Sequence, residues 1–278
     1  MYTLHSHFHS HDTRKGDRVL NRSVACVEVG ASSIQTVLFE SAGSHAFLEG
    51  AHRPPGHELA IAVPGLIEDD RVLEASNLGW ADVDPVEKLG LEGRACIVVN
   101  DAGAAALGEA RLRGGEVLGR LIYLGLGTGI GGAVVEDGEL VAENLFGHMG
   151  GFGSAGCACG GRGCLETVAA GWALPTPIDD SSIVAAASSI AEAIHREPLA
   201  TAESLVVLGG GIARAYPQIV DLVRAGLEGL QVETTSAPGQ AKSAAPWGLL
   251  HLVSNLDKNV LGYEDHLARA STMSVGGG

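Results

Sequence analysis

The chain has 278 residues, of which 46% are hydrophobic and 4% aromatic, and its formal net charge is −15. This length and hydrophobic content are enough for one large core or two medium ones, which excludes a disordered chain. The negative charge would repel a phosphate backbone, so we expect no nucleic-acid partner. No apolar run reaches the roughly 18 residues of a membrane span, and the N-terminal segment lacks the apolar stretch of a signal peptide. We therefore expect a cytoplasmic protein with reduced thiols and no membrane contact.

Both ends of the chain have the composition of tails. Residues 1–22 are polar and charged, which is typical of a tag-like or disordered segment, and a metal site built from their histidines is the alternative. Residues 255–278 are a second polar segment, which ends in three glycines. The histidines of the first tail alternate with other residues and are His5, His7, His9 and His11.

Between these tails, predicted strands alternate with predicted helices. Runs rich in Val, Ile and Leu that end at Gly, Pro or Asp-Gly predict buried strands. An alanine-rich run after Asp101, the region 178–200 and the stretch after Gly211 predict helices. Strands that alternate with helices indicate an α/β fold, and two strand-rich regions that each open with a small-residue turn indicate two related lobes. The predicted strands lie in 23–30, 34–40, 58–65, 94–99, 120–126, 130–136, 139–141 and 204–208.

Three of the five cysteines lie close together in the sequence CACGGRGC. Cys157, Cys159 and Cys164 are separated by glycines, which allow the tight turns that direct all three sulfurs inward. The nearest upstream candidate for a fourth ligand is His148. Three cysteines and one histidine are a composition of structural zinc sites, in which no coordination position stays open for water. Three reduced, unliganded thiols on a loop are the alternative.

The motifs GLGTGIGG, GHM and CACGGRGCLE follow one another, with NDAGAAALGEA upstream and VVLGGGIA downstream. This arrangement resembles the ROK family of sugar kinases and related regulators, over about residues 23–253. The resemblance implies an actin-like (ribonuclease H-like) α/β fold with two lobes, a cleft between them and a structural zinc that braces the loop lining the sugar pocket. We expect a small N-terminal lobe over 23–99, a larger lobe with the zinc loop over 100–242, and a helix over 243–254 that returns to the N-terminal lobe.

The resemblance also implies roles for individual residues. Asp101 would be the general base that takes the proton of a sugar hydroxyl as it attacks the γ-phosphate, and a simple N-cap of the following helix is the alternative. Asn100 and Glu166 would bind sugar hydroxyls, and His148 would bind zinc through one ring nitrogen and the sugar through the other. The expected phosphate- and nucleotide-binding residues are Glu28, Gly30, Ser32, Gly127, Thr128, Gly129, Gly209 and Gly210. An ordinary glycine-rich hairpin and a plain strand-to-helix connection are the alternatives for these glycines.

The sequence departs from the family pattern in three places. The first phosphate motif, Asp-x-Gly-Gly-Thr in the family, is EVGASS here, so Glu28 keeps the charge that would order Mg²⁺ while Ala31 restricts the turn. Position 145 is Leu, where sugar kinases of the family carry a Glu that binds sugar. This departure leaves three alternatives. The substrate lacks the hydroxyl that the Glu would bind, Glu143 substitutes for the missing carboxylate, or sugar binding is weak. The segment 171–205 is shorter than in the family.

Together these features predict a kinase that depends on ATP and Mg²⁺ and phosphorylates a primary hydroxyl of a hexose or a modified hexose. An amino sugar or a cyclitol would suit the pocket at Leu145. The alternative is a non-catalytic sugar-binding protein of the same fold with decayed phosphate loops. A regulator of this family would carry a DNA-binding domain before Glu28, and we reject it because 27 residues precede that position. We also expect a homo-oligomer, most simply a dimer, as in the family.

Overall fold

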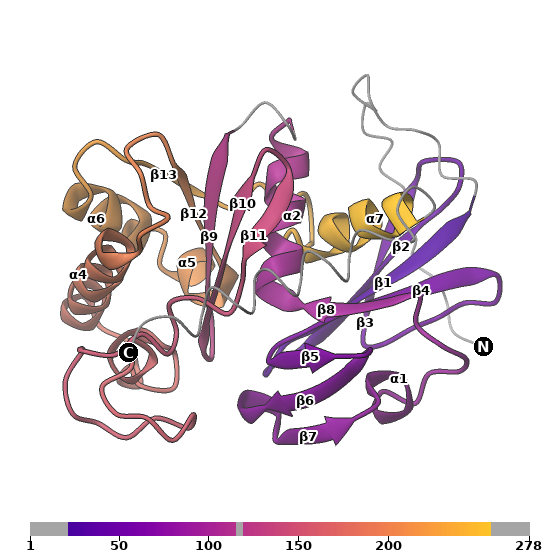
Figure 1. Cartoon of the computed structure of the whole chain (residues 1–278), viewed down its shortest axis with the longest axis horizontal. Coiled ribbons are helices and arrows are strands. Elements are labelled where there is room, and N and C mark those ends of the chain that lie inside the picture. Colours follow the sequence, from indigo (N-terminus) through magenta and orange to yellow (C-terminus); the bar gives the residue numbers. More distant parts are fainter. Residues whose placement is uncertain (1–21, 115–118, 257–278) are drawn as a thin grey trace.

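The computed structural model describes residues 22–114 and 119–256, and two five-stranded sheets form its frame (Figure 1). The first sheet contains β1 (Ser23–Val29), β2 (Ile34–Phe39), β3 (His45–Glu49), β4 (His57–Val63) and β8 (Ile97–Asn100). The second contains β9 (Arg120–Leu126), β10 (Ile130–Glu136), β11 (Glu139–Ala142), β12 (Leu205–Gly209) and β13 (Gln231–Thr234). A three-stranded sheet contains β5 (Leu66–Glu68), β6 (Arg71–Ala75) and β7 (Trp80–Val83). The helices are the 3₁₀ helix η1 (Ser76–Leu78), α1 (Pro85–Lys88), α2 (Asp101–Leu112), α3 (Glu166–Ala169), α4 (Asp180–Arg196), α5 (Gly210–Ala215), α6 (Gln218–Gly226) and α7 (Ala245–Leu256).

The two large sheets have the same topology. Their strand orders are β3-β2-β1-β4-β8 and β11-β10-β9-β12-β13. In each sheet the first three strands in sequence are antiparallel neighbours, and the next two strands are added parallel to the first. The predicted α/β fold with two related lobes is therefore confirmed. The strands that lie in the middle of each sheet are the ones with the most continuous apolar runs, because both of their faces are covered.

Helices α2 and α7 join the two sheets. One hydrophobic core contains residues of β1 and β9 together with α2 and α7, while a second lies under α4 and α6 and a third lies on the outer side of the first sheet. Helix α7 contacts α2, β1 and β4, and Figure 1 shows it beside the first sheet and next to α2. The connection between the lobes is therefore a packed helix pair and not an exposed linker.

This helix pair packs so closely that two of its positions have room for glycine alone. A Cβ atom on Gly108 would lie 1.9 Å from the carbonyl oxygen of Ala244, and one on Gly248 would lie 1.8 Å from that of Ala104. We predict that Gly248→Ala lowers the free energy of unfolding by about 1–3 kcal/mol because the helices must move apart. Urea denaturation monitored by circular dichroism measures this change. Gly211→Ala is the control, since its Cβ would meet nothing within 4 Å, and an equal loss in both variants would contradict the prediction.

The ends of the folded region differ slightly from the predicted ones. The predicted N-terminal tail includes Arg22, but this side chain forms an ion pair with Glu58 at 2.7 Å and donates to the carbonyl oxygen of Val253 at 3.2 Å, so it belongs to the folded part. At the other end, helix α7 continues to Leu256, beyond the predicted helix end. The four alternating histidines and the rest of both predicted tails lie outside the described residues. Among the helices of 22–114 and 119–256, none combines the length and hydropathy that crossing a membrane requires.

Candidate functional site

A cavity of about 1860 Å³ lies between the two lobes and is lined by residues from both. Most of the predicted site residues line it, although they come from widely separated parts of the sequence. Gly209, Cys157 and Cys164 do not line it. The predicted residues that do are Glu28, Gly30, Ser32, Asn100, Asp101, Gly127, Thr128, Gly129, His148, Cys159, Glu166 and Gly210.

The shared topology of the sheets explains why these segments meet. The turn of residues 30–33 joins β1 to β2, and the turn of residues 127–129 joins β9 to β10 at the equivalent place in the second sheet. Strands β8 and β12 are parallel to the first strand of their sheets and end at Asn100 and Gly209. The carboxyl ends of parallel strands form the edge at which α/β sheets bind ligands. Both turns and both strand ends therefore open into one cavity.

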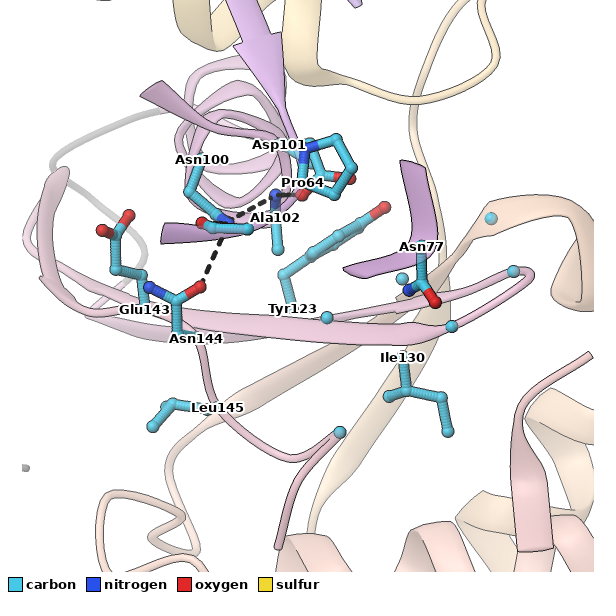
Figure 2. A pocket seen from close by; sticks show the side chains of 18 of the residues that line it. Pro64, Asn77, Asn100, Asp101, Ala102, Tyr123, Ile130, Glu143, Asn144 and Leu145 are labelled. Carbon is cyan, nitrogen blue, oxygen red and sulfur yellow. Dashed lines mark hydrogen bonds between the residues drawn. The ribbon is translucent and has the colours of Figure 1, made fainter. Parts of the chain in front are cut away.

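Asp101 is the first residue of helix α2 and lines the cavity beside Pro64 (Figure 2). Its Oδ1 accepts a hydrogen bond of 2.9 Å from the backbone nitrogen of Ala102. Burial raises the pKa of the Asp101 carboxyl from 3.8 to about 6, although that hydrogen bond acts in the opposite direction. The N-cap of α2 is Asn100 and not Asp101. Capping therefore does not explain the presence of this carboxylate. Its pKa lies close to neutral pH, as the pKa of a general base should.

Asn100 uses its whole side chain inside the protein. Its Oδ1 accepts from the backbone nitrogens of Ala102 and Gly103, and its Nδ2 donates to the carbonyl oxygen of Gly65 and to Oδ1 of Asn144, both at 3.1 Å. The bond to Asn144 is drawn in Figure 2. A sugar hydroxyl that binds Asn100 would therefore have to replace one of the two acceptors of its amide hydrogens. The predicted contact between Asn100 and sugar stays a prediction.

Glu166 is buried at the start of helix α3 and lies against the second glycine turn. Its Oε1 accepts a hydrogen bond of 2.6 Å from the backbone nitrogen of Ile130. A Cβ on Gly129 would lie 2.4 Å from this oxygen and 2.4 Å from Nδ2 of Asn77. Glycine at position 129 thus allows a carboxylate of the larger lobe and an amide of η1 to meet at the turn, which an ordinary hairpin would not need. Asn77 has no motif around it, and the sequence alone did not identify it.

A half-buried acid lies near the end of β1, just before the turn of residues 30–33. One carboxylate oxygen of Glu28 is buried without a hydrogen-bond partner among the described residues. The pKa of Glu28 is raised from 4.5 to about 7, chiefly by burial and also by the neighbouring Asp101, while Ser243, Lys242 and Arg214 act in the opposite direction. Such an oxygen is well suited to a hydrated Mg²⁺ ion, whose charge would compensate for the lost solvation.

Gly209 and Gly210, at the junction of β12 and α5, have different roles. A Cβ on Gly209 would lie 2.5 Å from the hydroxyl oxygen of Tyr123, so this glycine is required for packing below the cavity. Gly210 has a positive φ of 89°, and its Cβ would lie 2.4 Å from the carbonyl oxygen of Leu126. Gly210 lines the cavity and Gly209 does not. Tight connection between strand and helix is therefore sufficient to explain Gly209.

The predicted metal ligands lie together on the loop before α3. One ligand atom from each of His148, Cys157, Cys159 and Cys164 lies within 4.8 Å of all the others. Sγ of Cys159 and Sγ of Cys164 are 3.6 Å apart, and Nδ1 of His148 is 3.6 Å from Sγ of Cys157. Ligands at about 2.3 Å around a tetrahedral zinc ion would be about 3.8 Å apart, so the spacing fits. The donor set suggests a zinc site.

Leu145 and Glu143 both line the cavity. Leu145 also packs against the core of the larger lobe, and Figure 2 shows its side chain directed away from the Glu143 carboxylate. Glu143 lines the cavity, and its carboxylate lies against Gly103 in the first turn of α2. Burial, followed by the charge of Asp101, raises the pKa of Glu143 from 4.5 to about 7. The cavity therefore keeps a carboxylate near Asp101, two residues before the expected position.

Comparison with known proteins agrees with this arrangement. Residues 42–227 match the model of the ROK family. The chain is 37% identical over 134 residues to a glucokinase of Halalkalibacterium halodurans, a match that covers 44% of this chain and 41% of the glucokinase. It is 27% identical over 297 aligned positions to a kanosamine kinase of Amycolatopsis mediterranei, covering 82% of this chain and 92% of that kinase. The chain thus matches less than half the length of the glucokinase.

The solved structures show the same fold. A ROK family glucokinase from Streptomyces griseus, in complex with glucose and AMPPNP, superposes with a TM-score of 0.57 at 22% identity, covering 83% of this chain and 98% of that one. This agreement confirms the two-lobed, actin-like α/β fold. The family match spans most of the described chain, from β3 through the cysteine cluster to the end of α6. On these grounds the protein belongs to the ROK family.

Proposed function

We propose that this protein is a kinase that transfers the γ-phosphate of ATP, with Mg²⁺, to a primary hydroxyl of a hexose or modified hexose. The observation that supports this most directly is the position of Asp101. Its carboxyl, with a pKa raised to about 6, lies in the same cavity as both glycine turns and the metal loop. A base, a phosphate-binding backbone and a polar pocket in one cleft are what phosphoryl transfer to an alcohol needs.

The residues divide between the two reacting partners. Asp101 would accept the proton of the attacking hydroxyl, while Glu166 and His148 would bind other hydroxyls of the sugar. The glycine turns at Gly30 and Gly127 would direct backbone N–H groups at the phosphates. Glu28 would hold Mg²⁺, which neutralises charge on the phosphates. Zinc, when bound, would hold the loop that carries His148 in place.

The experiment that tests the proposal is ADP release from ATP and Mg²⁺ across a panel of hexoses, amino sugars and cyclitols. Turnover that depends on a sugar, and that is lost in Asp101→Asn, would support the kinase. The second candidate is a non-catalytic sugar-binding protein, and the altered first turn with Ala31 favours it. Sugar binding by calorimetry with no turnover of any sugar would favour that candidate and contradict the kinase.

We further propose an amino sugar as substrate, bound through Glu143. This carboxylate has no ion pair or hydrogen bond in the described part of the chain, and it lies close to the charged Asp101. An ammonium group would compensate both charges. The kanosamine kinase that resembles this chain over most of its length acts on an amino sugar, as its name states.

Glu143→Gln should therefore reduce the preference for amino sugars over the matching neutral hexoses by about tenfold or more, because a charge-assisted hydrogen bond is lost. The ratio of kcat/KM values for glucosamine and glucose, and for kanosamine and glucose, measures this preference. Glu228→Gln is the control, since Glu228 is exposed outside the cavity. An unchanged ratio for both amino sugars would remove Glu143 from substrate selection.

A further inference from the structure

Two cationic side chains line the cavity without an ion pair to a carboxylate in the described part of the chain. Lys242 and Arg214 both border it, on the side of the first phosphate turn and of Gly210. Neither forms an ion pair among the described residues. This is unusual in a chain with 33 acidic and 18 basic residues. Arginines elsewhere in the described part do pair with a carboxylate, among them Arg22, Arg71, Arg113, Arg120, Arg196 and Arg224.

The backbone of Lys242 is held from both lobes. Its nitrogen donates to Oε1 of the buried Gln35 on β2 at 3.0 Å, and Nε2 of Gln35 donates to the carbonyl oxygen of Gln240, also at 3.0 Å. From the other lobe, the guanidinium of Arg214 on α5 donates to the carbonyl oxygen of Lys242. These bonds fix the base of the lysine side chain and place the guanidinium beside it. The guanidinium of Arg214 therefore lies beside the backbone of Lys242, and the charges of both side chains act on the carboxyl of Glu28.

The immediate surroundings of this pair are those of an anion site. Lys242 lines the main cavity and also a smaller hollow of about 600 Å³ on the other side of the first turn, so it borders residues 30–33 from two sides. Glu28 lies close enough that both cations lower the pKa of its carboxyl, yet burial still keeps that pKa near 7. Glu28 therefore compensates the positive charge of the two side chains only in part.

Charge balance in the cavity explains why such a pair is needed. The cavity also contains the carboxyl groups of Asp101, Glu143 and Glu166, which would repel a donor with three or more negative charges. Glycine turns supply N–H donors but no net charge, and in the first turn Ala31 and Ser32 reduce the backbone freedom available. Two cations at this turn restore the attraction.

We propose that Lys242 and Arg214 together bind the phosphate chain of the phosphoryl donor. This inference rests on the proposed kinase function and adds the donor-binding residues to it. The ligand chemistry is a linear chain of phosphates with Mg²⁺, which a nucleoside triphosphate and inorganic polyphosphate both offer. The lysine would act as a point charge and the arginine as a planar donor pair, as these side chains do at other phosphates.

The test is titration calorimetry on the full chain, with inorganic tripolyphosphate and with ATP as separate probes, each with Mg²⁺. Lys242→Met and Arg214→Gln should each weaken tripolyphosphate binding by about tenfold or more and reduce its dependence on salt. Lys242→Arg should retain most of the affinity. Lys88→Met is the matched control, because Lys88 is exposed at the end of α1 and outside the cavity. Sugar affinity should stay unchanged in all four variants, and the melting temperature should stay unchanged in Lys242→Met, Lys242→Arg and Lys88→Met.

The outcomes separate this inference from the proposed function. If no sugar is phosphorylated but tripolyphosphate binding depends on Lys242, the phosphate site stands and the kinase fails. If sugars are phosphorylated and Lys242→Met leaves the KM of the donor unchanged, the kinase stands and the inference is overturned. The inference is also overturned if neither tripolyphosphate nor ATP binds to the wild-type chain. An affinity for ATP about tenfold higher than that for tripolyphosphate would support a nucleotide donor. Equal affinities would support polyphosphate as the donor. Both results support the phosphate site.

Discussion

Asp101→Asn should lower kcat for the best sugar by about 10²–10⁴, the usual contribution of a positioned general base. The substitution is conservative, since the amide oxygen of Asn can accept the same hydrogen bond from the backbone nitrogen of Ala102. The affinity for the sugar should therefore change less than about twofold. Steady-state kinetics together with calorimetric sugar binding separates the two quantities. Asp137→Asn is the control, because Asp137 is an exposed turn residue with a positive φ that Asn also accepts.

The same variant should be more stable than the wild type at pH 7. The pKa of Asp101 is about 6 in the folded protein and 3.8 ordinarily, so the folded state binds the proton more tightly than the unfolded chain does. Its stabilising effect is complete below about pH 4 and is lost as the pH rises through about 6. Asn avoids this loss, and we expect a gain of about 1–3 kcal/mol in the free energy of unfolding. Full activity or lower stability in Asp101→Asn would contradict the assignment.

The ionisation of Asp101 also predicts a pH profile. A base acts only in its ionised form, so kcat/KM should rise through about pH 6 and reach a plateau above it. Because the charge of Asp101 raises the pKa of Glu28 and of Glu143, both pKa values should fall in Asp101→Asn. Rate measurements between pH 4.5 and about 8 in a constant-ionic-strength buffer test the profile. A rate that is constant across this range would exclude a titrating base.

Removal of the metal from the cysteine cluster should lower both stability and sugar affinity. In the absence of a metal, burial and the neighbouring sulfurs raise the pKa of the Cys164 thiol to about 12, so this thiol would become protonated. The loop would then no longer be held together by a metal ion. His148, which lines the cavity, would lose its fixed position. We expect sugar affinity to fall about 10–100-fold, as when groups that orient a ligand are removed, with a clear decrease in melting temperature.

Cys159→Ser and treatment with a chelator are two independent ways to make this change. Cys96→Ser is the matched control, because Cys96 lies outside the cluster and donates to the carbonyl oxygen of Leu59, as serine also can. Metal content by atomic spectroscopy, melting temperature and sugar affinity are the three measurements. Loss of stability with unchanged sugar affinity would mean that His148 does not contact the substrate. Wild-type protein that contains no metal would contradict the zinc site itself.

Much of the site could be predicted because its residues stand in local patterns. Cys157, Cys159 and Cys164 with their glycines have a spacing that few structures other than a metal loop require. Asp101 follows a buried strand directly and precedes an alanine-rich helix, so its place at a sheet edge follows from the periodicity of its neighbours. The glycine turn at 127–129 lies between two apolar runs that pair as a hairpin.

Other residues of the site come from segments without such a pattern. Asn77 belongs to a single 3₁₀ turn and reaches Gly129 across the cavity, while Asn144 has a positive φ of 57° and accepts from Asn100. Lys242 is placed by the amide of Gln35, 207 residues away in the sequence. Hydrophobic periodicity describes how a segment packs on its own sheet or helix, and it contains no information about which polar side chain meets which across a cleft.

The amino-acid sequence by itself determined the α/β class, the cluster of one histidine and three cysteines, the glycine turns and the acid at the end of β8, because each depends on residues near one another in the chain. The tertiary structure decided what these parts do together. It brought both hairpin turns into one cavity through the matching topology of the sheets, and it desolvated the half-buried Asp101, Glu28 and Glu143 so that their pKa values rise. It also placed Lys242 and Arg214 at the cavity without an ion pair to any residue of 22–114 and 119–256. Desolvation and charge proximity depend on distance in space, and that distance is set by folding.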